Sequence, residues 1–242
     1  MDLLEALARL KAASWIDLTH SFEPGIPHYV AFPDEERTVL FDYSDGFLAH
    51  RYSHIGQWGT HVDPPSHFIE GGRSLDALPV TDMLLELVVL DGSARVAEDP
   101  DYAVDPELIA AHERAHGEIP TGAFVAFRSG WGDRWPDPAA MRNEDQTGTS
   151  HFPGWGVEAL GMLVEERGVV GIGHEQTDTD PGQEVSAGRA PAELYILEAD
   201  RWQVELLANL GRVPERGALI LATWPKPRDG SGFPARCVAL ID

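Results

Sequence analysis

The sequence predicts an α/β fold, with a mixed sheet and a single domain that spans residues 1–242. In the second half of the chain, short apolar runs typical of buried strands alternate with segments of helical pattern. The first half contains too few helical patterns for a regular doubly wound sheet, so we expect extra hairpins there. The 242 residues contain no internal repeat and no low-complexity linker, which favours one large domain over two small ones.

The chain is strongly acidic, and this charge indicates which classes of partner it can bind. Lys and Arg together number 18, Asp and Glu number 40, and the net charge is −22. An acidic protein of this kind repels nucleic-acid phosphates and anionic membrane surfaces, so we expect neither as a partner, and a small-molecule substrate instead. Cys237 is the single cysteine, which excludes an intrachain disulfide and a cysteine-based zinc cluster.

The N-terminal segment, residues 1–14, has the apolar spacing of an amphipathic helix. Asp2 and Glu5 stand where a secretory signal requires positive charge. No apolar run approaches the roughly 20 residues that a membrane-spanning helix needs. We therefore expect a cytoplasmic protein.

Apolar runs and turn residues predict the remaining elements in chain order. The expected strands are residues 15–19, 38–43, 49–54, 87–91, 123–127, 169–173, 218–222 and 235–241. The expected helices are one that begins at Pro106, then 157–166, 191–198 and 201–210. Asp105 suits the N-cap of the first of these helices, and Asp200 with Gln203 suits a capping box for the last. Residues 131–150 are expected to form a long loop.

Two histidines lie one turn apart on the helix that begins at Pro106. His112 and His116 have the i, i+4 spacing that puts two side chains on the same helical face. The sequence shows no third ligand beside them, so we expect both to be exposed to solvent.

The densest group of polar side chains lies in residues 54–68, which read HIGQWGTHVDPPSHF. If this stretch is extended, Gln57, His61 and Asp63 point to one side. Pro64-Pro65 then ends the strand, because proline removes backbone donors. His61 and Asp63 offer an imidazole and a carboxylate, both ligands for Zn²⁺, Mn²⁺ or Fe²⁺. The spacing alone is equally compatible with a strand whose polar groups face a hydrated loop.

The core of this stretch resembles a known signature. Residues 59–68, Gly-Thr-His-Val-Asp-Pro-Pro-Ser-His-Phe, are similar to the Gly-Thr-His-x-Asp-x-Pro-x-His-Phe motif of the cyclase-like metal-dependent hydrolases, which include kynurenine formamidase and isatin hydrolase. The resemblance continues along most of the chain. Further similar segments are residues 16–19, 87–92, 171–173, 205–210 and 230–236.

This resemblance implies a swivelling β/β/α-type cyclase fold, a homodimer or homotetramer, and a divalent metal ion, Mn²⁺ or Zn²⁺. It also implies that His61, Asp63 and Glu205 bind the metal. His67 is implied to be the catalytic acid/base, a role that suits a histidine with a pKa near neutrality.

The chain departs from the family pattern at two positions. Gln57 stands where the signature usually begins with histidine, and Glu193 stands where a second histidine is expected. A carboxamide oxygen is a weak, neutral ligand, which favours harder metals than zinc. Either Gln57 or His174 is expected to complete the metal shell, and hydrogen bonding within a loop is an equal alternative for His174.

Three further side chains are candidates for the substrate pocket. Trp58 lies within the motif, and His54 immediately precedes it. Arg128 follows a predicted strand, where it would bind a substrate carboxylate or pair with one of the many acids.

These observations predict a metal-dependent amidohydrolase that opens the C–N bond of a small cyclic or aryl amide, similar to isatin or formylkynurenine. A biosynthetic cyclase or dehydratase that uses the same metal and His67 is a second hypothesis. A metal-binding module without catalysis is a third, because Gln57 and Glu193 depart from the family pattern.

Overall fold

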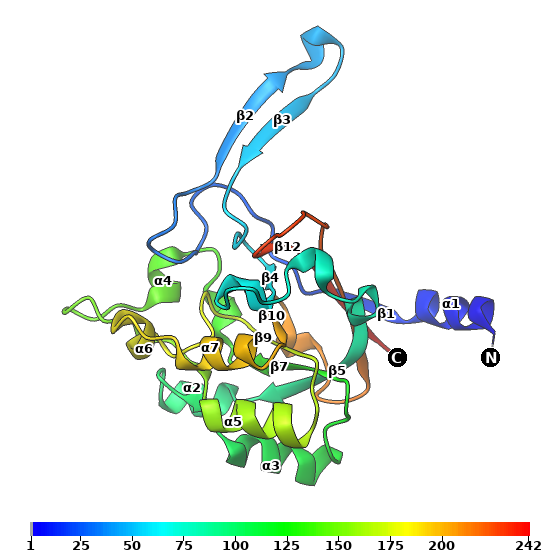
Figure 1. Ribbon diagram of the computed structural model, residues 1–242, viewed down its shortest axis with the longest axis vertical. Coiled ribbons are helices and arrows are strands. Elements are labelled where there is room, and N and C mark those ends of the chain that lie inside the picture. Colours follow the sequence, from blue (N-terminus) through cyan, green and yellow to red (C-terminus); the bar gives the residue numbers. More distant parts are fainter. Residues whose placement is uncertain (1) are drawn as a thin grey trace.

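The computed structural model describes residues 2–242, and within them one mixed sheet of nine strands lies at the centre (Figure 1). In spatial order the strands are β1 (Ser14–Asp17), β13 (Arg236–Ile241), β11 (Ala218–Thr223), β5 (Leu84–Asp91), β7 (Phe124–Arg128), β9 (Gly171–His174), β10 (Trp202–Glu205), β4 (His61–Asp63) and β12 (Phe233–Pro234). The neighbours from β5 to β10 run parallel, and the other neighbouring pairs run antiparallel. The predicted α/β class with a mixed sheet is confirmed.

Helices cover one face of the parallel strands. They are α2 (Ser93–Glu98), α3 (Pro106–His116), α5 (Val157–Gly161, continued by a π-helical turn at Met162–Glu166) and α7 (Pro191–Glu198). Alternate strand residues such as Val88 and Phe127 pack against the apolar sides of these helices. Figure 1 shows α2, α3 and α5 gathered at the end of the molecule opposite the long hairpin.

The opposite face of the sheet curls around a second apolar core. Phe124 of β7 and Trp202 of β10 are fully buried there, with ring centroids 5.1 Å apart. The backbone of residues 18–19 joins the two ends of the curl: Leu18 N donates to Cys237 O on β13, and Ala208 N donates to Leu18 O. This curl brings the segment that follows Glu205 of β10 next to Thr19, which bridges to Leu207.

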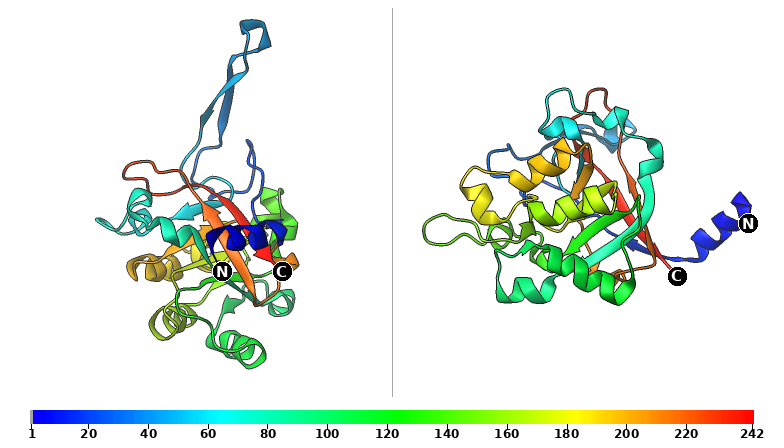
Figure 2. Two further views of the ribbon diagram at one scale, coloured as in Figure 1. Left: turned by 90° about the vertical axis from the view of Figure 1, so that its right-hand side faces the viewer. Right: turned by 60° about the horizontal axis from the view of Figure 1, so that its bottom comes forward.

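One hairpin stands away from the body of the protein (Figures 1 and 2). It consists of β2 (Glu36–Phe41) and β3 (Ala49–Ser53), close to the predicted positions, and every residue of β2 is exposed. The helix α1 (Leu3–Ala12) also projects from the body and has no buried residue. We refer to residues 36–53 as the arm.

The remaining elements are short. The helices are α4 (Pro138–Arg142) and α6 (Gly182–Ser186), and a separate two-stranded sheet joins β6 (Ala103–Val104) to β8 (Gly154–Trp155). Single 3₁₀ turns lie at Tyr43–Asp45, Pro65–His67, Leu75–Ala77, Val80–Met83, Trp131–Arg134 and Leu210–Arg212. Among residues 2–242, no helix combines the length and the apolar character that crossing a bilayer demands.

The predicted helix at residues 201–210 is wrong, because β10 occupies the start of that segment. Asp200 has φ +58°, whereas an N-cap residue takes an extended conformation, so the predicted capping box does not form. Trp202 and Val204 are buried in the apolar core, and they alternate with polar residues at the period of a strand. Tertiary burial on both faces of the sheet therefore overrides the helical pattern.

Two other expectations need correction. The segment 131–150 is not a continuous loop, since Asp137 caps the short helix α4 and Pro138 occupies its first position. Residues 57–60 are not part of a strand, since β4 begins only at His61 and Gly59 adopts φ +62°. An added Cβ at Gly59 would lie 2.9 Å from the Cβ of Phe22, so this tight approach of the chain requires glycine.

Candidate metal centre

The pairing of β4 with β10 assembles four polar side chains on one face of the sheet. The antiparallel register places Glu205 opposite His61 and Gln203 opposite Asp63. Residues two apart on a strand share a face, so all four side chains point to the same side. The intervening Val62 points into the apolar core. All four polar residues are buried, and this is the site that the sequence motif predicts.

The tautomer of His61 prepares it to bind a cation. Its Nδ1 lies 2.8 Å from Gly59 O, an acceptor only, so Nδ1 carries the hydrogen. Its Nε2 lies 3.1 Å from Asp63 Oδ2 and 3.5 Å from Glu205 Oε2, yet has no aligned hydrogen bond. A nitrogen lone pair that faces two carboxylate oxygens needs a proton or a metal ion between them.

The charges around His61 favour a cation in the same way. Burial by itself lowers the pKa of His61, but the Asp63 carboxylate, the Gly59 carbonyl and Asp178 together raise the pKa above its ordinary value. Burial opposes ionisation of Asp63, yet His61 and His67 lower its pKa to about 2. His61, Asp63 and Glu205 have donor atoms within 4.8 Å of one another. The donor set therefore fits a divalent metal ion, as predicted.

Two more carboxylates, those of Glu193 and Asp178, lie close enough to interact electrostatically with this set. Burial, and then the charge of neighbouring carboxylates, raises the pKa values of Glu205 and Glu193 well above the usual value. Burial also raises the pKa of Asp178 to about 7. So many acids in one buried region repel one another, and a divalent cation would relieve that repulsion.

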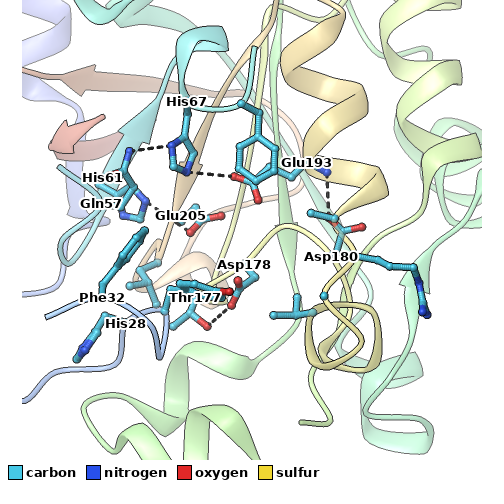
Figure 3. A pocket seen from close by; sticks show the side chains of 17 residues that line it. His28, Phe32, Gln57, His61, His67, Thr177, Asp178, Asp180, Glu193 and Glu205 are labelled. Carbon is cyan, nitrogen blue, oxygen red and sulfur yellow. Dashed lines mark hydrogen bonds and ion pairs between the residues drawn. The ribbon is translucent and has the colours of Figure 1, made fainter. Parts of the chain in front are cut away.

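His67 lies beside the donor set and reaches the cavity. It belongs to the 3₁₀ turn Pro65–His67, which begins where the proline pair ends β4. Its Nδ1 is 3.3 Å from Gln57 Nε2, and its Nε2 is 3.7 Å from Glu193 Oε1. Its side chain is 19% exposed, so it can meet both a substrate and solvent. Figure 3 shows His67 between Gln57 and Glu193.

Gln57 does not present an oxygen to the donor set. Its Nε2 lies 2.8 Å from Ser231 O and 3.0 Å from Asp63 Oδ1, and two such acceptors identify this atom as the amide nitrogen. Gln57 therefore donates to Asp63 and orients it. The expectation that Gln57 offers a ligand oxygen is not supported by this geometry.

His174 lies behind Glu205, at the end of β9. Its Nε2 is 3.3 Å from Thr179 Oγ1 and 3.6 Å from Glu205 Oε1. Complete burial lowers its pKa to about 3, so the ring is neutral. Its Nδ1 has no partner among the described residues. His174 thus contacts the donor set from the side away from the cavity.

Gln203 was missed as a site residue because its segment was predicted to be helical. Its Nε2 lies 3.1 Å from Glu193 Oε1 and 3.3 Å from Glu205 Oε1. The hydroxyl of Thr179 donates to Gln203 Oε1 over 2.7 Å and holds the amide in this orientation. The alternation Trp-Gln-Val-Glu in residues 202–205 was the pattern that could have revealed it.

A cavity of about 290 Å³ opens beside the donor set. Its apolar walls include Tyr29, Phe32 and Phe68, and its polar side includes His61, His67, Glu193 and Glu205. Figure 3 shows His28 and Phe32 on the side opposite Asp180. The volume is at the small end of the range for small-molecule sites.

The three residues predicted for the substrate pocket lie outside this cavity. Arg128 donates to Asp91 Oδ2 over 2.6 Å at another surface. Trp58 is fully buried behind the cavity, where its indole donates to Glu35. His54 lies between Phe22 and Phe233. Each of these side chains contacts other residues of the protein, which is the commoner role of such side chains.

A model of the family described as "Cyclase: Putative cyclase" matches residues 16–181. The chain belongs to this Cyclase family. Its curated relative from Roseibium aggregatum, an isatin hydrolase, is 36% identical over 243 residues, which cover 93% of this chain and 91% of the relative. The predicted family is therefore confirmed.

Solved structures of other Cyclase-family proteins have the same fold. Isatin hydrolase A from Ralstonia solanacearum has a TM-score of 0.90 and 33% identity, with 100% of this chain and 98% of that chain covered. An isatin hydrolase bound to the product analogue thioisatinate has a TM-score of 0.91 and 30% identity, with 100% and 99% covered. With the donor set, these likenesses identify this Cyclase-family chain as a metal-dependent hydrolase of a non-peptide C–N bond, as predicted.

Proposed function

We propose that the chain hydrolyses isatin, a bicyclic aromatic amide, and opens its five-membered ring at the C–N bond. The observation that carries this proposal is the 36% identity to an isatin hydrolase over nearly the whole chain. The cavity supports it, because aromatic side chains line one wall and the buried polar set lies on the other. A small, flat, aromatic amide fits both walls.

The proposed metal ligands are His61, Asp63 and Glu205, and the proposed metal is Mn²⁺. One imidazole nitrogen and several carboxylate oxygens make an oxygen-rich donor set, which suits Mn²⁺ better than the nitrogen- and sulfur-rich sites that select zinc. When bound, the metal would lower the pKa of water and polarise the amide carbonyl. Gln57 and Gln203 hold Asp63 and Glu205 in place through their amide hydrogens.

His67 is proposed as the proton carrier. Hydrolysis adds a water oxygen to the carbonyl carbon, breaks the C–N bond and transfers one proton to the leaving nitrogen. His67 lines the cavity, and its Nε2 lies 3.7 Å from the buried Glu193. Nε2 of His67 would take a proton from the attacking water and pass it to the leaving nitrogen.

The Mn²⁺-loaded protein is expected to convert isatin in ¹⁸O-labelled water into a ring-opened acid that carries one ¹⁸O in its new carboxylate. Mass spectrometry of the product measures the label, and a reaction without protein gives the background. Loading with Zn²⁺ is expected to give a lower kcat/KM. Unlabelled product would favour a cyclase or dehydratase, and metal-loaded protein that leaves isatin unchanged would refute the proposed substrate.

We also propose that the chain forms a homodimer through the arm. The arm exposes several large apolar side chains, among them Phe41 and Phe47, whose rings lie 5.0 Å apart and which are 46% and 54% exposed. An isolated two-stranded hairpin is only marginally stable in water. A second copy of the chain would bury these side chains and stabilise the arm.

Replacing both Phe41 and Phe47 by glutamate is expected to convert the dimer into a monomer, because two charges would be buried at the contact. Analytical ultracentrifugation measures the mass. Val80→Glu is the matched control, since Val80 is 76% exposed on the body of the protein and outside the arm. A wild-type monomer, or a dimer that survives the double substitution, would contradict this role of the arm.

A further inference from the structure

A second group of metal-ligand side chains lies outside the cavity, at the C-terminal end of α3. The expectation that His112 and His116 are both exposed is wrong for His112, whose side chain is only 2% exposed. The third partner, absent from the neighbouring sequence, is Glu215 from the loop before β11. His112 Nδ1 lies 3.3 Å from Glu215 Oε2, and His116 Nε2 lies 3.5 Å from the same oxygen.

These distances match those between neighbouring ligand atoms around a tetrahedral metal ion. Zn–N and Zn–O bonds of about 2.0–2.2 Å in tetrahedral geometry place neighbouring ligand atoms about 3.3–3.5 Å apart. The 3.3 Å contact between His112 Nδ1 and Glu215 Oε2 is a long hydrogen bond, which a zinc ion between the two atoms would replace. The donor atoms of His112, His116 and Glu215 all lie within 4.8 Å of one another.

The surroundings leave this group free to take a cation. The guanidinium of Arg216 is directed elsewhere, with Nε 3.4 Å from Glu86 Oε1 and Nη1 3.3 Å from Glu118 O. His116 and Glu215 are 33% and 39% exposed, so an ion has access from solvent. The backbone of Glu215 is held in place, because the Glu215 carbonyl accepts a hydrogen bond from Val89 N in β5.

We propose that His112, His116 and Glu215 form a second divalent-metal site that selects Zn²⁺. Two imidazoles and one carboxylate give a nitrogen-rich set, in contrast to the oxygen-rich set in the cavity, and nitrogen ligands favour zinc over manganese. The fourth position faces solvent and takes water. The ion joins the end of α3 to the loop before β11, so its role is to stabilise this part of the fold.

The test uses the metal-free full-length protein titrated with Zn²⁺ alone. His116→Ala and Glu215→Gln alter exposed side chains, so both variants are expected to fold. Each is expected to bind one fewer zinc per chain than the wild type by elemental analysis after dialysis. Loss of one ligand should weaken this site by at least about 100-fold, beyond the loss from removing an outer-shell partner. Zinc should also raise the melting temperature of the wild type more than that of either variant.

His151→Ala is the matched control, because His151 hydrogen-bonds to Asp101 in a separate region and belongs to neither group. It is expected to keep the wild-type zinc content. His61→Ala separates the two sites, since it should lose zinc from the cavity and keep zinc at His116. Equal zinc content and equal thermal shifts in the wild type and His116→Ala would overturn the proposal, whatever the cavity binds.

Discussion

Replacing His61 by alanine is expected to remove the metal from the cavity and to reduce turnover of isatin to the uncatalysed rate. His61 supplies the only imidazole in the proposed ligand set, and its Nε2 faces both carboxylates. Without it, Asp63 and Glu205 remain buried with no neutral ligand between them. Elemental analysis of the Mn²⁺-loaded variant and its kcat/KM for isatin measure the two effects.

His151→Ala is the control for the first variant. His151 hydrogen-bonds to Asp101 over 2.7 Å in a separate region, and does not line the cavity. The control is expected to keep the wild-type metal content and activity. A His61→Ala variant with undiminished Mn²⁺ would rule out the proposed ligand set, even if its activity were low.

Replacing His67 by alanine is expected to lower kcat by about 10²–10⁴-fold, the usual contribution of a general acid/base. The metal content should stay at the wild-type level, because His61, Asp63 and Glu205 remain in place. Steady-state kinetics and elemental analysis on the same preparation measure both quantities.

A second measurement distinguishes proton transfer from a ligand role of His67. The donor atoms of Asp63, His67 and Glu193 also lie within 4.8 Å of one another, so loss of metal is the expected result if His67 is a ligand. If His67 carries the proton, small imidazole-like bases should restore part of kcat to the alanine variant without changing its metal content. Metal loss in this variant would therefore contradict the acid/base assignment.

The sequence was most informative where the chemistry is local. Residues 59–67 contain two of the proposed ligands and the proposed proton carrier within one short motif, and the proline pair ends β4 as expected. Glu205 was assigned by family resemblance, although its segment was predicted to be a helix. That error removed Gln203 from consideration, because only the strand puts Gln203 and Glu205 on the same face.

Contacts between distant segments could not be predicted from local patterns. Glu215 lies about one hundred positions beyond His112, and no local sequence pattern near either residue predicts their contact. The aromatic wall residues Tyr29 and Phe32 come from an irregular loop with no periodicity, so Trp58 was predicted for the pocket instead. Trp58 packs where large aromatic residues usually do, in the interior.

The three-residue strand β4 lies near the edge of the sheet, and the register that pairs His61 with Glu205 also decides which way its side chains point. A slip of a single position would turn the proposed ligands of β4 into the apolar core and Val62 toward the cavity. Only the native pairing presents the complete set of proposed ligands, so a bound ion would stabilise that pairing alone. Metal binding and folding would then be thermodynamically linked, and the bound metal would fix the register of a strand that is too short to specify its own alignment.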